Sequence, residues 1–305
     1  MVDGTRRLGV LARLTHQCDF SHALVTETTS RMRFLRPRRT FTSSSSSSIA
    51  ALVAAAKPSS LAVLAPQQGV KWSYEELDLK ARCLAAGLED LGYGPGSIAI
   101  SDVPNVAENL LVQTALAHLG AGIATPPKDA DALAAMCAKH DVRGVICVNG
   151  AEPPLSSPLA SPLPAVHLEV AEGARPAAGS VALGELVEHC PPRGSAPAAT
   201  GSTTLGVFGG AALTQSSALS LGAAAAAKLA ITDSDRVCCS VTLMHAFGLT
   251  AVTAALGTDA CVVCCPPSAA SAAAATPPSG RPLRRRCSLR VARLSSSEIR
   301  TRCAP

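Results

Sequence analysis

Cysteine carries the most varied chemistry in this sequence, because a thiol can bind a metal ion, form a disulfide or act as a nucleophile. The chain of 305 residues has 12 Cys, and several in its central part fall in apolar runs typical of buried strands. A zinc site would need a set such as Cys238, Cys239, Cys261 and Cys264, but the Cys-x-x-Cys at 261–264 encloses two Val in a strand-like run rather than in a turn. The pattern therefore favours buried thiols in a reducing compartment, and we expect no metal site.

Arginine dominates the start of the chain. Residues 1–48 contain eight Arg, three acidic residues, no Lys and many Ser, which is the composition of an organelle transit peptide. The segment Arg39-Thr40-Phe41-Thr42-Ser43 resembles a mitochondrial presequence cleavage site. We predict that residues 1–48 are a targeting or disordered leader and that the protein is mitochondrial. A plastid or cytoplasmic location is the alternative.

The end of the chain is basic as well. Residues 266–305 contain eight Arg and a single acidic residue, Glu298, with Ala-Ser-Pro low complexity and no helical or strand period. We predict a disordered basic tail, or a gene model that leaves its reading frame near Cys265. The middle, residues 49–265, has 11 basic and 18 acidic residues, a net charge of −7. This acidic body argues against a nucleic-acid partner.

Residues 49–265 carry the patterns of one partial folded domain. Ser73 and Glu76 have the spacing of a helix capping box, and apolar residues then recur on one helical face until Gly92. Further helices are expected at 106–119, 129–139, 181–189 and 214–229, and strands at 97–101, 121–124, 144–148, 205–208, 236–241 and 260–264. The alternation of helices with short apolar strands predicts an α/β fold with a parallel sheet built from βαβ units. The chain has no run of 18 strongly apolar residues, so we expect no membrane span.

Several of these segments resemble the opening of the large N-terminal domain of adenylate-forming enzymes, the family of acyl-CoA synthetases, peptide-synthetase adenylation domains and luciferases. The matching segments, in the family's order, are Trp72-Ser73-Tyr74-Glu75-Glu76-Leu77, Gly92-Tyr93-Gly94-Pro95-Gly96, Pro104-Asn105 and Leu119-Gly120-Ala121. A second block at 232–237 (TDSDRV) is similar to the family's Thr-x-x-Asp-Arg-Val. The resemblance covers about residues 60–266.

The resemblance also points to two candidate sites. The segment 243–248 (LMHAFG) looks like the motif whose His and Gly border the acyl pocket, so it implies this role for His245 and Gly248, although His245 could instead cap a strand end. The stretch 201–210 occupies the place of the phosphate-gripping loop, and Ser202, Thr204, Gly206 and Gly210 suit its pattern. The family's Pro and Lys are replaced there by Phe208 and Gly209, and an ordinary Gly-rich loop before a helix is the alternative.

The family reaction joins a carboxylic acid to coenzyme A with ATP and Mg²⁺, and it releases AMP and pyrophosphate. The family's Tyr-Gly-x-Thr-Glu and Thr-Gly-Asp segments and its C-terminal Lys domain do not follow in this sequence, so catalytic residues cannot be assigned. We expect a truncated or degenerate acyl-CoA synthetase-like protein that is inactive as this chain, with doubtful binding of ATP, Mg²⁺ and coenzyme A. The alternative is a non-catalytic α/β binding or scaffold protein derived from that family. The acid substrate and the oligomeric state stay undetermined.

Overall fold

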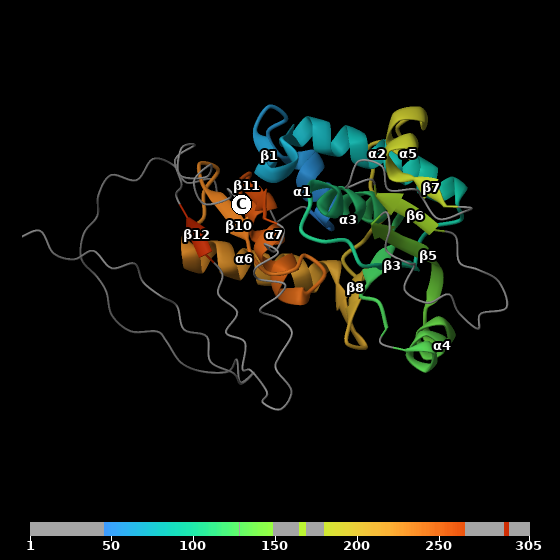
Figure 1. Cartoon of the computed structure of the whole chain (residues 1–305). Coiled ribbons are helices and arrows are strands. Elements are labelled where there is room, and N and C mark those ends of the chain that lie inside the picture. Colours follow the sequence, from blue (N-terminus) through green and yellow to red (C-terminus); the bar gives the residue numbers. More distant parts are fainter. Residues whose placement is uncertain (1–45, 128, 149–164, 169–179, 266–289, 293–305) are drawn as a thin grey trace, which may run out of the picture.

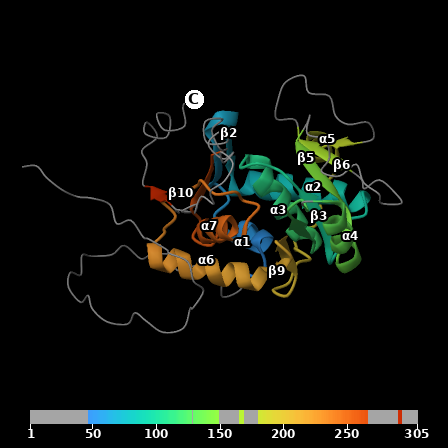
Figure 2. The ribbon, with the colours of Figure 1, turned by 60° about the horizontal axis from the view of Figure 1, so that its bottom comes forward.

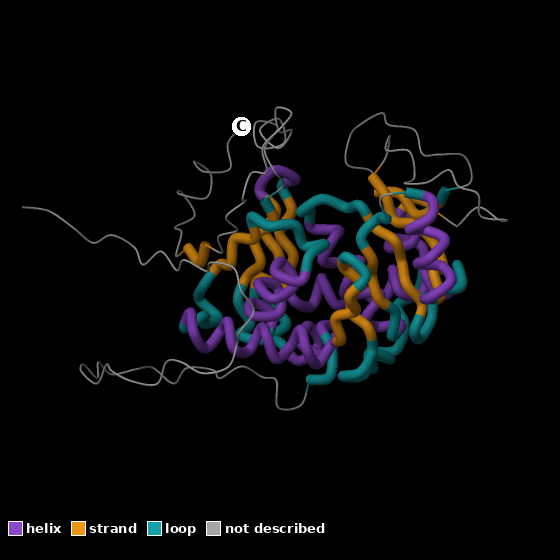
Figure 3. The backbone as a smooth tube through the Cα atoms, turned by 90° about the horizontal axis from the view of Figure 1, so that it is seen from below, coloured by secondary structure: helices purple, strands orange, loops and turns teal. Residues whose placement is uncertain are grey.

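A computed structural model describes residues 46–127, 129–148, 165–168, 180–265 and 290–292 (Figure 1). Nearly all of the predicted leader and most of the predicted basic tail lie outside the described residues. The described strands form two separate sheets with helices between them (Figure 3).

The larger sheet has seven strands in the order β7-β6-β5-β3-β4-β8-β9. All neighbouring strands are parallel except β8 and β9, which form an antiparallel hairpin at one edge. The strand bounds are β3 Ser97–Ser101, β4 Gly122–Ala124, β5 Asp141–Val148, β6 Ala165–Leu168, β7 Val181–Ala182, β8 Thr204–Phe208 and β9 Ala211–Thr214.

The smaller sheet has five strands in the order β12-β10-β11-β1-β2. Its centre is parallel, with Val262 of β11 opposite both Val63 of β1 and Val237 of β10. The two edge strands, β2 and β12, run antiparallel to their neighbours. The bounds are β1 Leu61–Ala65, β2 Val70–Ser73, β10 Arg236–Cys239, β11 Cys261–Cys264 and β12 Arg290–Ala292.

Helix α2 begins where the capping box predicts. The Ser73 hydroxyl accepts a hydrogen bond from the Glu76 N–H at 3.1 Å, and the Glu76 carboxylate accepts one from the Ser73 N–H at 2.7 Å. The helices are α1 Ile49–Ala55, α2 Tyr74–Asp90, α3 Ala107–Leu119, α4 Ala130–Lys139, α5 Leu183–His189, α6 Gln215–Leu229 and α7 Ala246–Leu256, with a short 3₁₀ helix, η1, at Pro66–Gln68.

Helix α3 is the centre of the core. All of its residues except Glu108 are buried, which is typical of a helix covered on every side. It packs against α1 and α2 and contacts both β1 and β4, so it touches both sheets. Figure 1 shows α1 and α3 between the sheets, and Figure 2 shows α6 lying beside α7. One apolar cluster joins the facing sides of the two sheets.

The predicted α/β class with parallel strands is confirmed, because every strand expected from the sequence is present and has at least one parallel neighbour. Two findings go beyond the prediction: the strands divide into two sheets, and antiparallel strands form both edges of the smaller sheet and one edge of the larger sheet. No helix within the described ranges is long and apolar enough to cross a membrane.

Candidate functional site

The loop between β10 and α7 is held in place by a side chain from the other half of the fold. Asn105, which is buried, donates hydrogen bonds from Nδ2 to the carbonyl oxygens of Cys239 at 3.2 Å and Val241 at 2.7 Å. Its Oδ1 accepts a hydrogen bond from the backbone N–H of Leu243 at 2.8 Å. The loop before His245 is therefore fixed at three points by one amide.

Two more buried amides extend this attachment into α3. Gln113 donates from Nε2 to the carbonyl oxygen of Leu243 at 3.3 Å and to Asn109 Oδ1 at 2.7 Å. Asn109 in turn donates to the carbonyl oxygen of Val103 at 2.7 Å. Three side chains from 105–113 thus form one hydrogen-bond network, and each is buried. Because buried amides are costly to leave unpaired, this network specifies the path of the loop.

His245 is exposed at the end of this loop and serves as the N-cap of α7. Its Nδ1 accepts a hydrogen bond from the backbone N–H of Phe247 at 3.2 Å. A ring nitrogen that accepts a hydrogen bond carries no proton, so the neutral ring holds its proton on Nε2, which can donate to a ligand. The histidine therefore caps a helix rather than a strand end, and a role beside an acyl group stays a prediction.

Gly248 lies in the first turn of α7, against the same loop. A Cβ atom at this position would stand 2.1 Å from the carbonyl oxygen of Thr242 and 3.1 Å from the Cα of Leu243. Only glycine lets the loop pack this closely on the helix. His245 and Gly248, both predicted from the sequence, therefore lie together at the start of α7.

The stretch 201–210 is divided among three kinds of structure. Ser202 lies in the turn before β8, where its hydroxyl is 3.0 Å from that of Thr200. Thr204 and Gly206 lie within β8, and Gly206 is paired with Ile123 of β4 on one side and with Leu213 of β9 on the other. The backbone of this part of the stretch is therefore engaged in the sheet rather than in a loop.

Gly209 and Gly210 form the whole connection between β8 and β9. Their φ angles are +58° and +84°, as a two-residue hairpin turn of type I′ requires. Neither residue has a side chain, so the turn has no Lys and no hydroxyl group with which to hold a triphosphate. Gly210 is therefore separated from Ser202, Thr204 and Gly206 by the strand. The residues present do not fit the phosphate-gripping loop that the resemblance implies.

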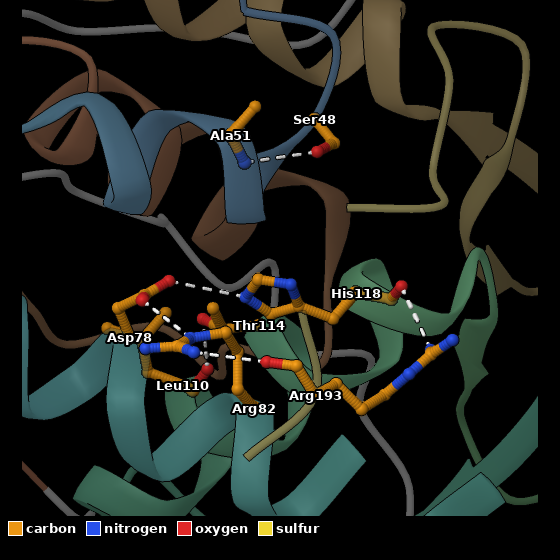
Figure 4. Close-up of polar contacts among 8 residues, drawn as sticks. All are labelled: Ser48, Ala51, Asp78, Arg82, Leu110, Thr114, His118 and Arg193. Carbon is orange, nitrogen blue, oxygen red and sulfur yellow. Dashed lines mark hydrogen bonds and ion pairs between the residues drawn. The ribbon is translucent and has the colours of Figure 1, made fainter. Parts of the chain in front are cut away.

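A cluster of charged side chains between α2 and α3 was not predicted from the sequence (Figure 4). Asp78 accepts a hydrogen bond from Arg82 Nε at 2.9 Å, and its other oxygen is 3.4 Å from Nε2 of the buried His118. Burial alone would raise the pKa of the Asp78 carboxyl, but the imidazole of His118 and the guanidinium of Arg82 together hold this pKa below its usual value. The carboxylate is thus stabilised in its charged form.

The same cluster fastens the segment that leads to β8. Arg82 Nη1 donates to the carbonyl oxygen of Arg193 at 3.0 Å, and Arg193 pairs with Glu89 at 3.1 Å. The carbonyl oxygen of His118 accepts hydrogen bonds from Arg193 Nη1 at 3.4 Å and from the N–H of Ala198 at 2.9 Å. The segment between α5 and β8 is therefore anchored to both α2 and α3. Asp78 and Arg82, four residues apart in a helix, were the only sequence signal of this cluster.

The cysteines considered for a zinc site do not share one face. Strand alternation places Cys239 and Cys264 on the inner face of the smaller sheet, and Cys238 and Cys261 on its outer face. These four thiols cannot converge on one ion. In the part of the chain that the structure describes, no group of three or more His, Cys, Asp and Glu side chains is arranged to hold a metal.

The sequence matches a known protein family, and solved structures share the fold of this chain. The family model described as AMP-binding enzyme matches residues 51–277. Similar solved structures include the apo structure of MbtA from Mycobacterium smegmatis, with a TM-score of 0.59 and 20% identity over 75% of this chain and 46% of that one. A benzoate CoA ligase from Burkholderia xenovorans has a TM-score of 0.58 and 18% identity over 71% of this chain and 45% of that one.

A putative long-chain-fatty-acid CoA ligase from Rhodopseudomonas palustris has a TM-score of 0.56 and 19% identity over 71% of this chain and 56% of that one. The chain thus spans about half the length of these structures. No curated protein matches the chain. Since the family model covers well over half of the sequence, the chain belongs to the family of AMP-binding enzymes, the AMP-forming ligases.

Proposed function

We propose that this chain is a degenerate acyl-CoA synthetase-like protein that does not adenylate a carboxylic acid by itself. One observation carries this proposal: the two-residue turn Gly209-Gly210 stands where the family's phosphate-gripping loop belongs. The resemblance of residues 243–248 to the family's acyl-pocket motif supports a retained role for His245 and Gly248 in holding an acyl group.

Adenylation of a carboxylic acid depends on how the protein holds the charge of ATP. Adenylation requires the triphosphate of ATP to be held while negative charge shifts among its oxygens, and enzymes stabilise that charge with Lys, metal ions and fixed N–H groups. Thr204 and Gly206 lie in a paired strand, and the turn that follows has no cation and no hydroxyl. Without such groups, the activation free energy of adenylation stays close to that of the uncatalysed reaction in water. We therefore expect weak ATP binding and no release of pyrophosphate.

The test is a pyrophosphate-release assay on the 305-residue chain with Mg-ATP, coenzyme A and a panel of fatty and aryl carboxylic acids. An intact acyl-CoA synthetase assayed in parallel shows that each acid is a usable substrate. The proposal predicts no release above the background without protein. Turnover with any acid, abolished by heat denaturation of the chain, would overturn it.

A non-catalytic scaffold protein is the second candidate function. Two leucines on α6, Leu221 and Leu229, are 48% and 39% exposed, so this helix presents two apolar side chains that a protein partner would cover. Co-purification of the chain with an intact ligase, lost in a Leu221→Ser and Leu229→Ser double variant, would favour this function. Retention of the complex in the double variant would remove this reason for it.

A further inference from the structure

The outer face of the smaller sheet brings two cysteines from distant parts of the sequence into contact. Cys238 lies in β10, and Cys265 follows the last residue of β11. Their sulfur atoms are 3.6 Å apart, at a distance where one thiol donates a hydrogen bond to the other. Both belong to the outer apolar cluster with Cys261 and Val263. Two thiols 27 positions apart in the chain are therefore neighbours in space.

This pair differs from the neighbouring cysteines in its exposure to solvent. Cys238 and Cys265 are partly exposed, whereas Cys239, Cys261 and Cys264 are buried. Burial raises the pKa of Cys239 and of Cys261 to about 12, which keeps these thiols protonated and poorly reactive. As residues, Cys238 and Cys265 are therefore more accessible to solvent than the buried three.

A cationic side chain also lies on the outer face of the smaller sheet. Arg236 precedes Cys238 by two positions in β10, so the two side chains point to the same side of the sheet. Its positive charge lowers the pKa of the nearby Cys261 thiol, against the larger opposite effect of burial. Arg236 therefore adds a positive charge to the face that carries Cys238, and the thiolate is the form of cysteine that attacks disulfides.

We propose that Cys238 and Cys265 form a reversible disulfide, which makes this pair a redox-sensitive modification site. A disulfide has a sulfur–sulfur distance of about 2.0 Å, so the sulfur atoms must approach by about 1.6 Å from their present contact. Rotation of the two side chains and a small adjustment at Cys265 supply this movement, because Cys265 lies beyond the last hydrogen-bonded residue of β11.

The chemistry needs a small oxidised disulfide, such as oxidised glutathione, as the oxidant. One cysteine thiolate attacks a sulfur of the small disulfide, forms a mixed disulfide and expels the first small thiolate. The second cysteine thiolate then attacks the protein sulfur of that mixed disulfide and expels the second small thiolate. The two cysteines lose two electrons, the small disulfide gains them, and the two protons of the cysteines end on the two small thiols.

The disulfide would constrain residues 238–265. Residues 238–265 include the loop held by Asn105, the cap residue His245 and all of α7. A disulfide between its ends closes this segment into a ring and restricts the unfolded chain. The disulfide depends on the two sulfur atoms and needs neither ATP nor a carboxylic acid.

The experiment equilibrates the full chain with glutathione buffers from fully reduced to mostly oxidised, blocks remaining thiols with N-ethylmaleimide, and maps disulfides in protease digests by mass spectrometry. We expect one cross-link, between the peptides that contain Cys238 and Cys265, to increase with oxidation and disappear with dithiothreitol. Thermal unfolding of the oxidised chain should have a midpoint about 5 °C higher than that of the reduced chain.

Matched variants make the outcome specific. Cys238→Ser and Cys265→Ser should each abolish the cross-link and the shift in midpoint, while Cys137→Ser, at another partly exposed thiol, should leave both unchanged. A dominant cross-link to any other cysteine, or complete alkylation of Cys238 and Cys265 in the most oxidising buffer, would overturn the proposal. Because the mapping uses the wild-type chain, this result stands even where a variant folds poorly.

Discussion

The side-chain oxygen of Asn105 accepts a hydrogen bond at 2.8 Å from the backbone N–H of Leu243, which lies 138 positions later in the sequence. This contact joins the segment that enters α3 to the loop that leads to His245. Both segments belong to blocks that resemble the same enzyme family. The hydrogen bond explains in physical terms why an Asn follows Pro104: a side chain with one acceptor and two donors can hold three backbone groups of a turn.

Replacement of Asn105 by Ala should destabilise the protein by about 2–3 kcal/mol, because it leaves buried backbone groups of the loop without partners. The free energy of unfolding in urea measures this effect. Gln67→Ala removes an exposed amide from the 3₁₀ helix η1 and should change that free energy by less than about 0.5 kcal/mol. Equal, small effects of the two substitutions would contradict the role assigned to Asn105.

Gly248→Ala should also destabilise the protein, by about 2 kcal/mol or more, because the new methyl group would overlap the carbonyl oxygen of Thr242. Gly184→Ala is the matched control, since Gly184 is also helical and a Cβ there meets no atom within 4 Å. The control should be neutral or stabilising, by up to about 1 kcal/mol. Urea or thermal unfolding distinguishes the two, and similar stabilities of both variants would be inconsistent with the close packing described.

His245→Ala removes the N-cap of α7 and should lower the free energy of unfolding by about 1 kcal/mol. Asn is among the best N-cap residues, so His245→Asn should restore most of this stability. Chemical denaturation of the three proteins tests the role. If His245→Asn were as unstable as His245→Ala, the ring would stabilise the protein by some means other than capping.

Asp78 should make the stability of the folded protein depend on pH in the acidic range. Its folded-state pKa is lowered, so its contribution is fully present above the unfolded-state pKa of about 3.9 and is lost as the pH falls through the lower folded-state value. Wild type should therefore be more stable than Asp78→Asn at pH 7, and the difference should shrink below about pH 4.

Thermal unfolding of both proteins between pH 7 and pH 3 gives this comparison. Asp233→Asn, at an exposed carboxylate, serves as the control for a general change in charge. A difference between wild type and Asp78→Asn that stays constant across the whole range would show that the charged form of Asp78 is not what matters.

The local elements were predictable, because their signals are local. The capping box at Ser73 and Glu76 and the apolar period after it predicted α2 to within a residue or two. The short strands at 97–101 and 144–148 were recognised by their apolar runs. The division into two sheets was not predictable, because it depends on pairings such as Val63 with Val262, which no local pattern encodes.

The site was less predictable than the fold. The network of Asn105, Asn109 and Gln113 depends on contacts across more than 100 positions, so sequence spacing alone does not reveal it. The stretch 201–210 did contain a usable signal. Two glycines between the short apolar runs 205–208 and 211–213 favour a hairpin, and this pattern competed with the pattern of a phosphate loop.

Isothermal titration calorimetry of Mg-ATP with the full chain tests whether the protein still holds a triphosphate. The two-residue turn at Gly209-Gly210 predicts no saturable heat at ATP concentrations below the millimolar range, under conditions where an intact acyl-CoA synthetase binds the nucleotide. Saturable binding of one ATP per chain with a micromolar Kd would show that the triphosphate is held without the loop, and would contradict the account.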